Sequence, residues 1–334
     1  MLRALRFLLG QQGVLPARST PQRVVVGQQA AWCYEPVGAR LGTVMTVHGM
    51  TPLGAEDPRM IRLNHALSWA GFRVISPQVD SIAELRIHAG QIDTLERCID
   101  DAARGRLCPD GKVAIFAPSF SAGLALIAAG RPRVAERVRA VCAVGTYANV
   151  RTTMQAVLQG TQTTPYVWRI VLANFVSDAV PDGEHVRDAL LAAARDEWWA
   201  DRGRAPALLT AQLDRVSAAT RQRITTLLRD PDARRACFDR IVARQPPMLA
   251  LASVVDQLDG LRARVTLLHG QHDATIPAAQ SEQLAAALRD RALPHRLLVT
   301  PLLGHGGVKA SRAAAHHGLA LLRHVAGWIE DARA

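Results

Sequence analysis

Aromatic side chains and lysine are scarce in this chain of 334 residues. Phenylalanine, tryptophan and tyrosine make up 4% of the sequence, and lysine occurs only at Lys112 and Lys309. Arginine therefore carries almost all of the positive charge behind the net charge of +11, and the arginines are spread along the chain among acidic residues. Proteins that read nucleic acid usually combine a concentrated basic stripe with aromatic side chains that stack on bases. The sequence therefore argues against nucleic acid as a partner.

Long apolar runs and paired cysteines are also missing. No stretch approaches the ~18 to 20 consecutive apolar residues that a membrane-spanning helix needs. The five cysteines are an odd number without a C-x-x-C pair, so neither a disulfide framework nor a zinc site is indicated. The sequence contains no G-x-G-x-x-G and no phosphate-binding lysine motif, so no nucleotide cofactor is implied. We expect reduced thiols in a cytoplasmic protein that needs no cofactor.

Residues 1–10 mix leucine and phenylalanine with Arg3 and Arg6. This stretch is too short in its apolar part, and too interrupted by charge, to read as a secretory signal. Two interpretations remain. The residues form a short amphipathic helix that packs on the domain, or they make a weak peripheral contact with a membrane surface.

Short apolar runs alternate with helical patterns over the first and last parts of the chain. We expect residues 23–34 to form an antiparallel pair of strands, and further strands at 43–47, 72–76, 112–117, 139–144, 264–269 and 296–299. Helical patterns separate them at 59–70, 92–103, 122–129, 278–288 and 313–329. Buried strands that alternate with helices predict an α/β fold, in which a mostly parallel sheet carries helices on both faces.

The alternation stops for residues 149–262, which have helical patterns at 187–199, 207–228 and 233–243. We therefore predict an N-terminal extension (1–22) and an α/β core in two parts (23–148 and 263–334), interrupted by a helical cap (149–262). The cap would cover the carboxyl edge of the sheet, where open α/β folds bind ligands. Trp198 and Trp199 point about 100° apart on a helix, so we expect at most one of them to face a pocket.

The segment Ser119-Phe120-Ser121-Ala122-Gly123 follows an expected strand and opens a helix of small residues. A serine in such a strand-to-helix turn has an exposed hydroxyl, and small residues on both sides let the backbone close the turn. Ser121 has Ser119 and Gly123 as its small neighbours, so we predict Ser121 as a nucleophile. Ser119 is the alternative.

A second polar segment, His48-Gly49-Met50, ends the strand at 43–47. The glycine lets the backbone turn so that the Met50 N–H joins the Ala122 N–H in an oxyanion hole, each donor contributing a factor of ~10² to 10³ in rate. We interpret His48 as a residue that organises the loop.

Two further loops after strands carry Asp273 and His305. Because parallel strands end at one edge of a sheet, both side chains can meet Ser121 there as acid and base. The chain order serine, aspartate, histidine is the order expected for this architecture. Asp273 with His269 and His272 could alternatively suggest a metal site, but no third and fourth ligand lie nearby in the sequence, so we expect no metal.

With these four segments in this order, the chain resembles the α/β-hydrolase superfamily over residues 24–148 and 263–330. The resemblance implies that Ser121 is the nucleophile, Asp273 the acid and His305 the base, with Met50 and Ala122 as the oxyanion donors.

The chain departs from the superfamily pattern at Ser119, where a glycine is usual. The expected activity is hydrolysis of a carboxylic ester or related acyl bond of a small-molecule substrate through an acyl-enzyme. A thioesterase, peptidase, C–C hydrolase or acyltransferase would use the same triad. A non-catalytic protein that binds a ligand or partner is the remaining alternative.

Overall fold

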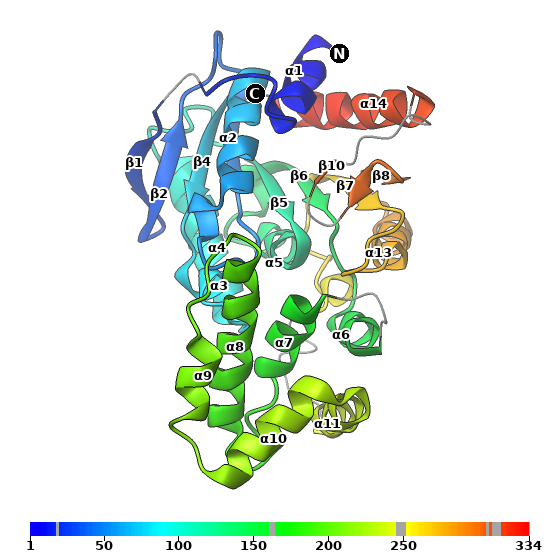
Figure 1. Cartoon of the computed structure of the whole chain (residues 1–334). Helices are drawn as coiled ribbons and strands as arrows, with labels where there is room; N and C mark the ends of the chain where they lie inside the picture. Colours follow the sequence, from blue (N-terminus) through cyan, green and yellow to red (C-terminus); the bar gives the residue numbers. More distant parts are fainter. Residues whose placement is uncertain (18–19, 160–163, 245–251, 305–306, 309–314, 334) are drawn as a thin grey trace.

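A computed structural model describes residues 1–17, 20–159, 164–244, 252–304, 307–308 and 315–333 (Figure 1). Its centre is an eight-stranded sheet with the order β1-β2-β4-β3-β5-β6-β7-β8. The strands are β1 (Gln22–Val26), β2 (Gln29–Tyr34), β3 (Gly42–Thr46), β4 (Phe72–Pro77), β5 (Val113–Pro118), β6 (Val138–Val144), β7 (Arg264–Gly270) and β8 (His295–Thr300). The six strands from β3 to β8 run parallel, and β1 and β2 form the expected antiparallel pair at one edge. The predicted mostly parallel α/β sheet is confirmed.

Helices cover both faces of the sheet. One face buries apolar side chains of α1 (Leu2–Gln11), α2 (Pro58–Ala70) and α14 (Ala315–Ala332). The other face buries those of α4 (Gly90–Arg104), α5 (Ser119–Ala129) and α13 (Ala278–Asp290). Short elements join them, namely η1 (Gly54–Glu56), α3 (Asp80–Ala83), η2 (Ala135–Arg137), η3 (Val254–Asp256) and the strand pair β9 (Leu303–Gly304) and β10 (Gly307–Val308).

Helix α2 shows how local sequence sets the ends of an element. Its N-cap residue Asp57 accepts a hydrogen bond from the backbone N–H of Arg59 (2.9 Å), and Pro58 stands at the first helical position. Gly71 ends the helix with φ = +105°, a left-handed conformation that glycine adopts without a steric penalty. This places Asp57 and Arg59 at the end of the sheet where β3 and β5 finish.

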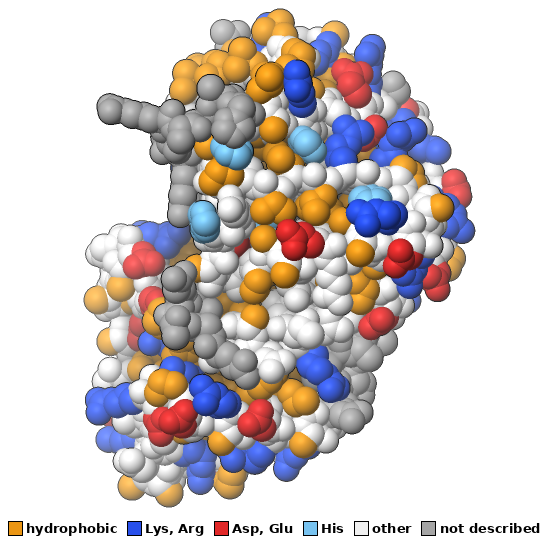
Figure 2. Space-filling view, turned by 90° about the vertical axis from the view of Figure 1, so that its right-hand side faces the viewer, with side chains coloured by type: hydrophobic (Ala, Val, Ile, Leu, Met, Phe, Trp, Pro, Cys, Tyr) orange, Lys and Arg blue, Asp and Glu red, His pale blue; other side chains and the backbone are white. Residues whose placement is uncertain are grey.

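The helices α6 (Val150–Gln159), α7 (Pro165–Ala173), α8 (Gly183–Ala200), α9 (Leu208–Leu213), α10 (Ala218–Arg229) and α11 (Pro231–Ala243) lie between β6 and β7. We call α6 to α11 the insertion. It has an apolar cluster of its own, with Leu190 and Ile224 at its centre. Basic and acidic side chains are interspersed on its surface, in the lower part of Figure 2. The single helix predicted for 207–228 is wrong, because Ser217 caps a new helix by accepting from the Thr220 N–H (3.2 Å).

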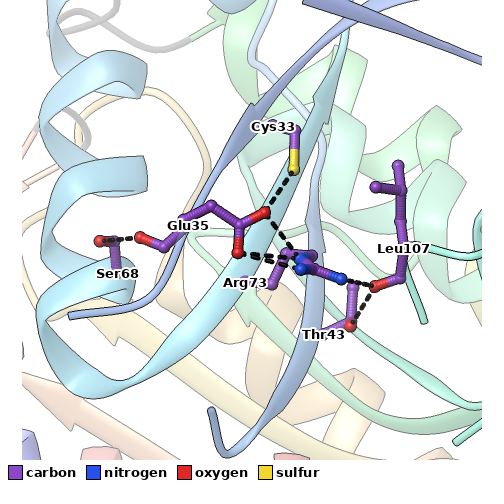
Figure 3. Close-up of polar contacts among 6 residues, drawn as sticks. All are labelled: Cys33, Glu35, Thr43, Ser68, Arg73 and Leu107. Carbon is purple, nitrogen blue, oxygen red and sulfur yellow. Dashed lines mark hydrogen bonds and ion pairs between the residues drawn. The ribbon is translucent and has the colours of Figure 1, made fainter. Parts of the chain in front are cut away.

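The amino end of the sheet is closed by a polar cluster between β2, β3 and β4 (Figure 3). The Arg73 guanidinium binds both carboxylate oxygens of Glu35, at 3.1 Å and 3.0 Å. It also donates to the carbonyl oxygen of Leu107 (3.1 Å), which accepts a second bond from Thr43 Oγ1 (3.0 Å). The polar groups of this cluster are hydrogen-bonded to one another, and the carboxyl ends of β3 and β4 lie at the opposite edge of the sheet.

All five cysteines are buried and free of disulfide bonds. In the parts of the chain that the structure describes, no helix combines the length and apolar character needed to cross a bilayer.

Candidate active site

The turn between β5 and α5 contains a strained residue at the carboxyl edge of the sheet. Pro118 ends the strand in an extended conformation, and Ser119 follows with φ = +58°. A residue other than glycine seldom adopts this left-handed region, and such strain gathers at functional sites. Ser119 also lines the large cavity described below.

Ser121 occupies a different environment. Its side chain is fully buried, and its hydroxyl donates to the carbonyl oxygen of His48 at 2.6 Å. Ser121 is not among the residues that line the cavity. This geometry is at odds with the prediction that Ser121 is the nucleophile. The strained residue is Ser119, and its small neighbours two positions away are Ala117 and Ser121.

Gly123 is the small residue on which the prediction of Ser121, two positions after Ser119, was based. The structure explains the presence of this glycine by packing. A Cβ atom on Gly123 would lie 2.4 Å from the ring of Tyr147. The Tyr147 ring stacks on Phe120, with 5.3 Å between ring centroids and 14° between planes. The glycine therefore allows the close approach of α5 and the Tyr147 ring, which belongs to the segment after β6.

The loop after β3 lies beside this turn and is held by His48. The Val79 N–H donates to His48 Nε2 (3.0 Å), so Nε2 carries no hydrogen and Nδ1 donates to the Gly49 carbonyl oxygen (2.9 Å). Burial lowers the pKa of His48, which keeps the ring neutral. His48 thus fixes the backbone of the Gly49–Met50 segment, and both of these residues line the cavity.

Candidate oxyanion donors follow from the position of α5. The first N–H groups of a helix have no partner inside it, whereas the fourth residue's N–H pairs with the carbonyl of the N-cap. Phe120 is the second residue of α5 and lines the cavity together with Met50. Ala122 is the fourth residue, is fully buried and does not line the cavity. The burial of Ala122 disfavours it as a donor, and Phe120 is the alternative candidate beside Met50.

Asp273 is held in the loop after β7. Its side chain is 1% exposed, and Oδ1 accepts hydrogen bonds from the backbone N–H groups of Thr275 (2.8 Å) and Ile276 (3.0 Å). His269 Nε2 lies 3.5 Å from Oδ2 and donates to the Ile276 carbonyl oxygen (2.8 Å). His269 therefore supports this loop, and the carboxylate of Asp273 has a defined position at the carboxyl edge of the sheet.

His305, the predicted base, lies outside the described residues. Its neighbour Gly304 ends β9 and lines the same cavity as Ser119 and Thr275. Across the described part of the chain, no three His, Cys, Asp or Glu side chains are arranged as ligands of a metal ion.

A cavity of about 530 Å³ extends from the Ser119 turn between the sheet edge and the insertion. This volume is typical of a small-molecule site. Most of its wall is apolar, including Met50, Phe120, Val150, Met154, Ile170, Val171, Phe175, Trp198, Ile276 and Leu303. Of the two neighbouring tryptophans in α8, only Trp198 lines it, as their angular separation predicts.

Among the polar residues that interrupt this apolar wall are Asp57, Arg59, Glu197 and Tyr166. Asp57 binds Arg59 through two guanidinium bonds, and although burial opposes ionisation, these bonds hold the pKa of Asp57 below its usual value. Glu197 pairs with Arg169, but burial outweighs that pairing and raises the Glu197 pKa. Tyr166 donates its hydroxyl to the Met50 carbonyl oxygen (2.8 Å). The sequence did not predict these contacts. Two of them join residues that are far apart in the chain, and the pair Asp57 and Arg59 belongs to no motif.

Residues 245–332 match the sequence model of the prolyl oligopeptidase family (Peptidase_S9). No curated protein matches the chain. Among solved structures, *Pyrococcus horikoshii* acylaminoacyl peptidase is similar with a TM-score of 0.54 and 12% identity, over 96% of this chain and 42% of that one. *Porphyromonas gingivalis* dipeptidyl peptidase 4 follows with a TM-score of 0.52 and 11% identity, over 92% of this chain and 35% of that one.

A puromycin-hydrolyzing peptidase of *Mycobacterium tuberculosis* is similar with a TM-score of 0.50 and 16% identity, over 93% of this chain and 39% of that one. The chain thus spans less than half the length of each of these three proteins. At such identities the similarity establishes a shared fold.

Proposed function

The chain is an α/β hydrolase by fold, and from this premise we propose that it is a serine hydrolase whose nucleophile is Ser119. The observation that carries the proposal is the left-handed backbone of Ser119 at the strand-to-helix turn, on the wall of the cavity. A nucleophilic serine of this fold occupies such a strained turn, which exposes its hydroxyl above the sheet.

The proposed mechanism gives each predicted residue one role. His305 accepts the Ser119 proton while the oxygen attacks the substrate carbonyl, and Asp273 orients the imidazole and stabilises its protonated form. The N–H groups of Met50 and Phe120 bind the oxyanion that develops. His305 then protonates the leaving group, and it activates a water molecule that releases the acyl group from Ser119.

The apolar cavity favours an ester or related acyl bond with an apolar acyl group as substrate. Side chains such as Met154, Val171 and Phe175 offer contact area without hydrogen-bond partners, which suits an alkyl or aromatic chain. A second candidate is a peptidase. It is supported by the match of residues 245–332 to the prolyl oligopeptidase family, because that segment contains Asp273 and His305.

Matched serine variants test the nucleophile. Against nitrophenyl esters of increasing acyl length, we expect Ser119→Ala to lose at least about 10³-fold in kcat. Ser121→Ala removes only the hydrogen bond to His48 and should keep activity within about tenfold. Loss of activity in Ser121→Ala with retention in Ser119→Ala would overturn the proposal.

Assays of the wild type and the two serine variants on aminoacyl nitroanilides distinguish an esterase from a peptidase. An esterase should have a kcat/KM for the esters that rises with acyl length as the cavity fills, and little activity on anilides. Higher kcat/KM values on anilides than on esters of the same acyl group would favour the peptidase instead.

A further inference from the structure

Two helices that pack against each other expose large apolar side chains. Leu2 and Leu5 of α1 are 62% and 44% exposed, and Leu319 of α14 is 43% exposed. Basic side chains, Arg6 on α1 and Arg323 on α14, are exposed beside them. We call these five residues the α1/α14 face. Hydrophobic side chains gather at the top of the view in Figure 2, at the end of the molecule where Figure 1 places α1 and α14.

Positive charge predominates on α1 and over most of α14. Neither α1 nor the neighbouring α2 contains an aspartate or glutamate. In α14 the only acidic residues are Glu330 and Asp331 in its last turn, which pair with arginines. Among the described residues no carboxylate pairs with Arg6 or Arg323. The insertion differs, because α8 and α11 each contain an ion pair within the helix, and Arg223 of α10 pairs with Asp182, the N-cap residue of α8.

The inner sides of the same two helices line the cavity. Phe7 and Leu8 of α1 and Leu321 and Val325 of α14 belong to its wall. Helix α1 therefore lies between an apolar binding cavity and an outer surface that combines leucine with arginine. A helix with leucines and arginines on one exposed face is suited to the interface of a lipid bilayer, where the leucines enter the acyl boundary and the arginines meet headgroups.

We propose that the α1/α14 face docks the protein on the surface of an anionic lipid bilayer. The positive charges of Arg6 and Arg323, with which no carboxylate of the described residues pairs, select anionic headgroups, and the leucines supply the apolar contact. Docking in this orientation brings the cavity wall formed by α1 and α14 next to the lipid. The proposal goes beyond the hydrolase function and does not depend on the chemistry at Ser119.

Vesicle co-sedimentation of the full chain tests the proposal with a matched pair of variants. Leu5→Glu and Val25→Glu each replace one exposed apolar side chain with a carboxylate. Val25 is 71% exposed but lies on β1, away from the α1/α14 face. With vesicles of phosphatidylcholine and phosphatidylglycerol, we expect Leu5→Glu to weaken binding at least tenfold and Val25→Glu to stay within twofold of the wild type.

Two further measurements complete the test. Arg6→Ala should weaken binding to the anionic vesicles by about fivefold, with no effect on the weaker binding to phosphatidylcholine alone. Ser119→Ala should bind like the wild type, which separates docking from catalysis. The proposal is overturned if the wild type fails to sediment with the anionic vesicles, or if Leu5→Glu and Val25→Glu bind equally. It is also overturned if sedimentation velocity shows that Leu5→Glu dissociates a dimer and leaves vesicle binding intact, because the face is then an interface between two copies of the chain.

Discussion

The sheet with its covering helices and the insertion are stabilised in different ways. The sheet buries continuous apolar clusters on both faces, and its strand ends fix Ser119 and Asp273 on short loops. The insertion has a smaller apolar cluster, and charged groups pack among its helices. Arg169 pairs with Glu197, and the guanidinium of Arg234 lies 4.4 Å from the ring centre of Trp168. The sheet thus holds Ser119 and Asp273 at defined positions, and the insertion contributes part of the cavity wall.

Polar contacts join the two regions. Gln280 of α13 accepts hydrogen bonds from the backbone N–H groups of Ala148 (3.0 Å) and Asn149 (3.1 Å), where the chain leaves the sheet. Ser253, which follows the insertion in the chain, accepts from the Val150 N–H at the start of the insertion (3.3 Å). The first connection is therefore held against α13, and the two ends of the insertion are held together.

The largest effect is expected in the sheet, from Asp273→Asn. We expect kcat to fall by about 10⁴, because an amide leaves the histidine in the wrong tautomer. The melting temperature should change little, because the amide oxygen still accepts from the Thr275 and Ile276 N–H groups. Steady-state kinetics and thermal melts check this. The control is Asp259→Asn, which removes an 87% exposed carboxylate of the sheet region and should leave kcat unchanged. Equal rates for the two variants would contradict the assignment of Asp273.

A pair of helix glycines tests the packing beneath the turn. Gly123→Ala should lower the free energy of unfolding by about 1 to 3 kcal/mol, because the new methyl group meets the Tyr147 ring. Gly318→Ala, in α14, meets no atom within 4 Å and should raise it by about 0.5 to 1 kcal/mol through helix propensity. Urea unfolding measures both. A neutral or stabilising Gly123→Ala would contradict the packing explanation for this glycine.

Tyr166→Phe tests the contact between the insertion and the Gly49–Met50 segment. Loss of one hydrogen bond to the Met50 carbonyl, worth about 0.5 to 1.5 kcal/mol, should lower kcat two- to tenfold and leave KM nearly unchanged. Tyr34→Phe, at a buried tyrosine in β2 outside the cavity wall, is the matched control. A change confined to KM would mean that Tyr166 serves only the cavity and has no influence on the loop.

The smallest expected effects are on the pH dependence of stability. Their signs are opposite for Asp57, at the sheet, and Glu197, in the insertion. The lowered pKa of Asp57 contributes stability above the carboxyl's unfolded pKa, and this contribution is lost as pH falls towards the folded pKa. The raised pKa of Glu197 works the other way, because its stabilising contribution is present at acid pH and is lost as pH rises through the folded pKa. In melting curves from pH 3 to 8, Asp57→Asn should therefore destabilise most at neutral pH. The melting temperature of Glu197→Gln, relative to that of the wild type, should be highest at neutral pH. The same pH trend in both variants would contradict these pKa directions.

The sequence was sufficient to predict the sheet. All six predicted parallel strands agree with the observed ones to within one residue at each end. The reason is physical, because strands buried on both faces read as short continuous apolar runs. The insertion was harder, since the predicted helix over 207–228 is broken where Ser217 begins a new one, and a capping serine inside a helical pattern is a weak signal.

The candidate site could not be predicted in full from the sequence, because the backbone conformation is needed to distinguish its residues. Ser119 and Ser121 both have small residues at suitable spacing, and only the φ angle of Ser119 and the buried hydroxyl of Ser121 separate them. The glycine at 123 favoured Ser121 in the sequence pattern, whereas the structure explains this glycine by its contact with Tyr147, which lies 24 residues away in sequence. The bond from Tyr166 to Met50 spans 116 positions and leaves no local pattern.

The most direct test of the account is to find the serine that reacts. The wild-type protein is labelled with a fluorophosphonate, digested, and analysed by tandem mass spectrometry, which assigns the adduct within the segment from Ser119 to Ser121. The account predicts the phosphonyl group on Ser119, with labelling retained in Ser121→Ala and absent in Ser119→Ala. An adduct on Ser121 would contradict it.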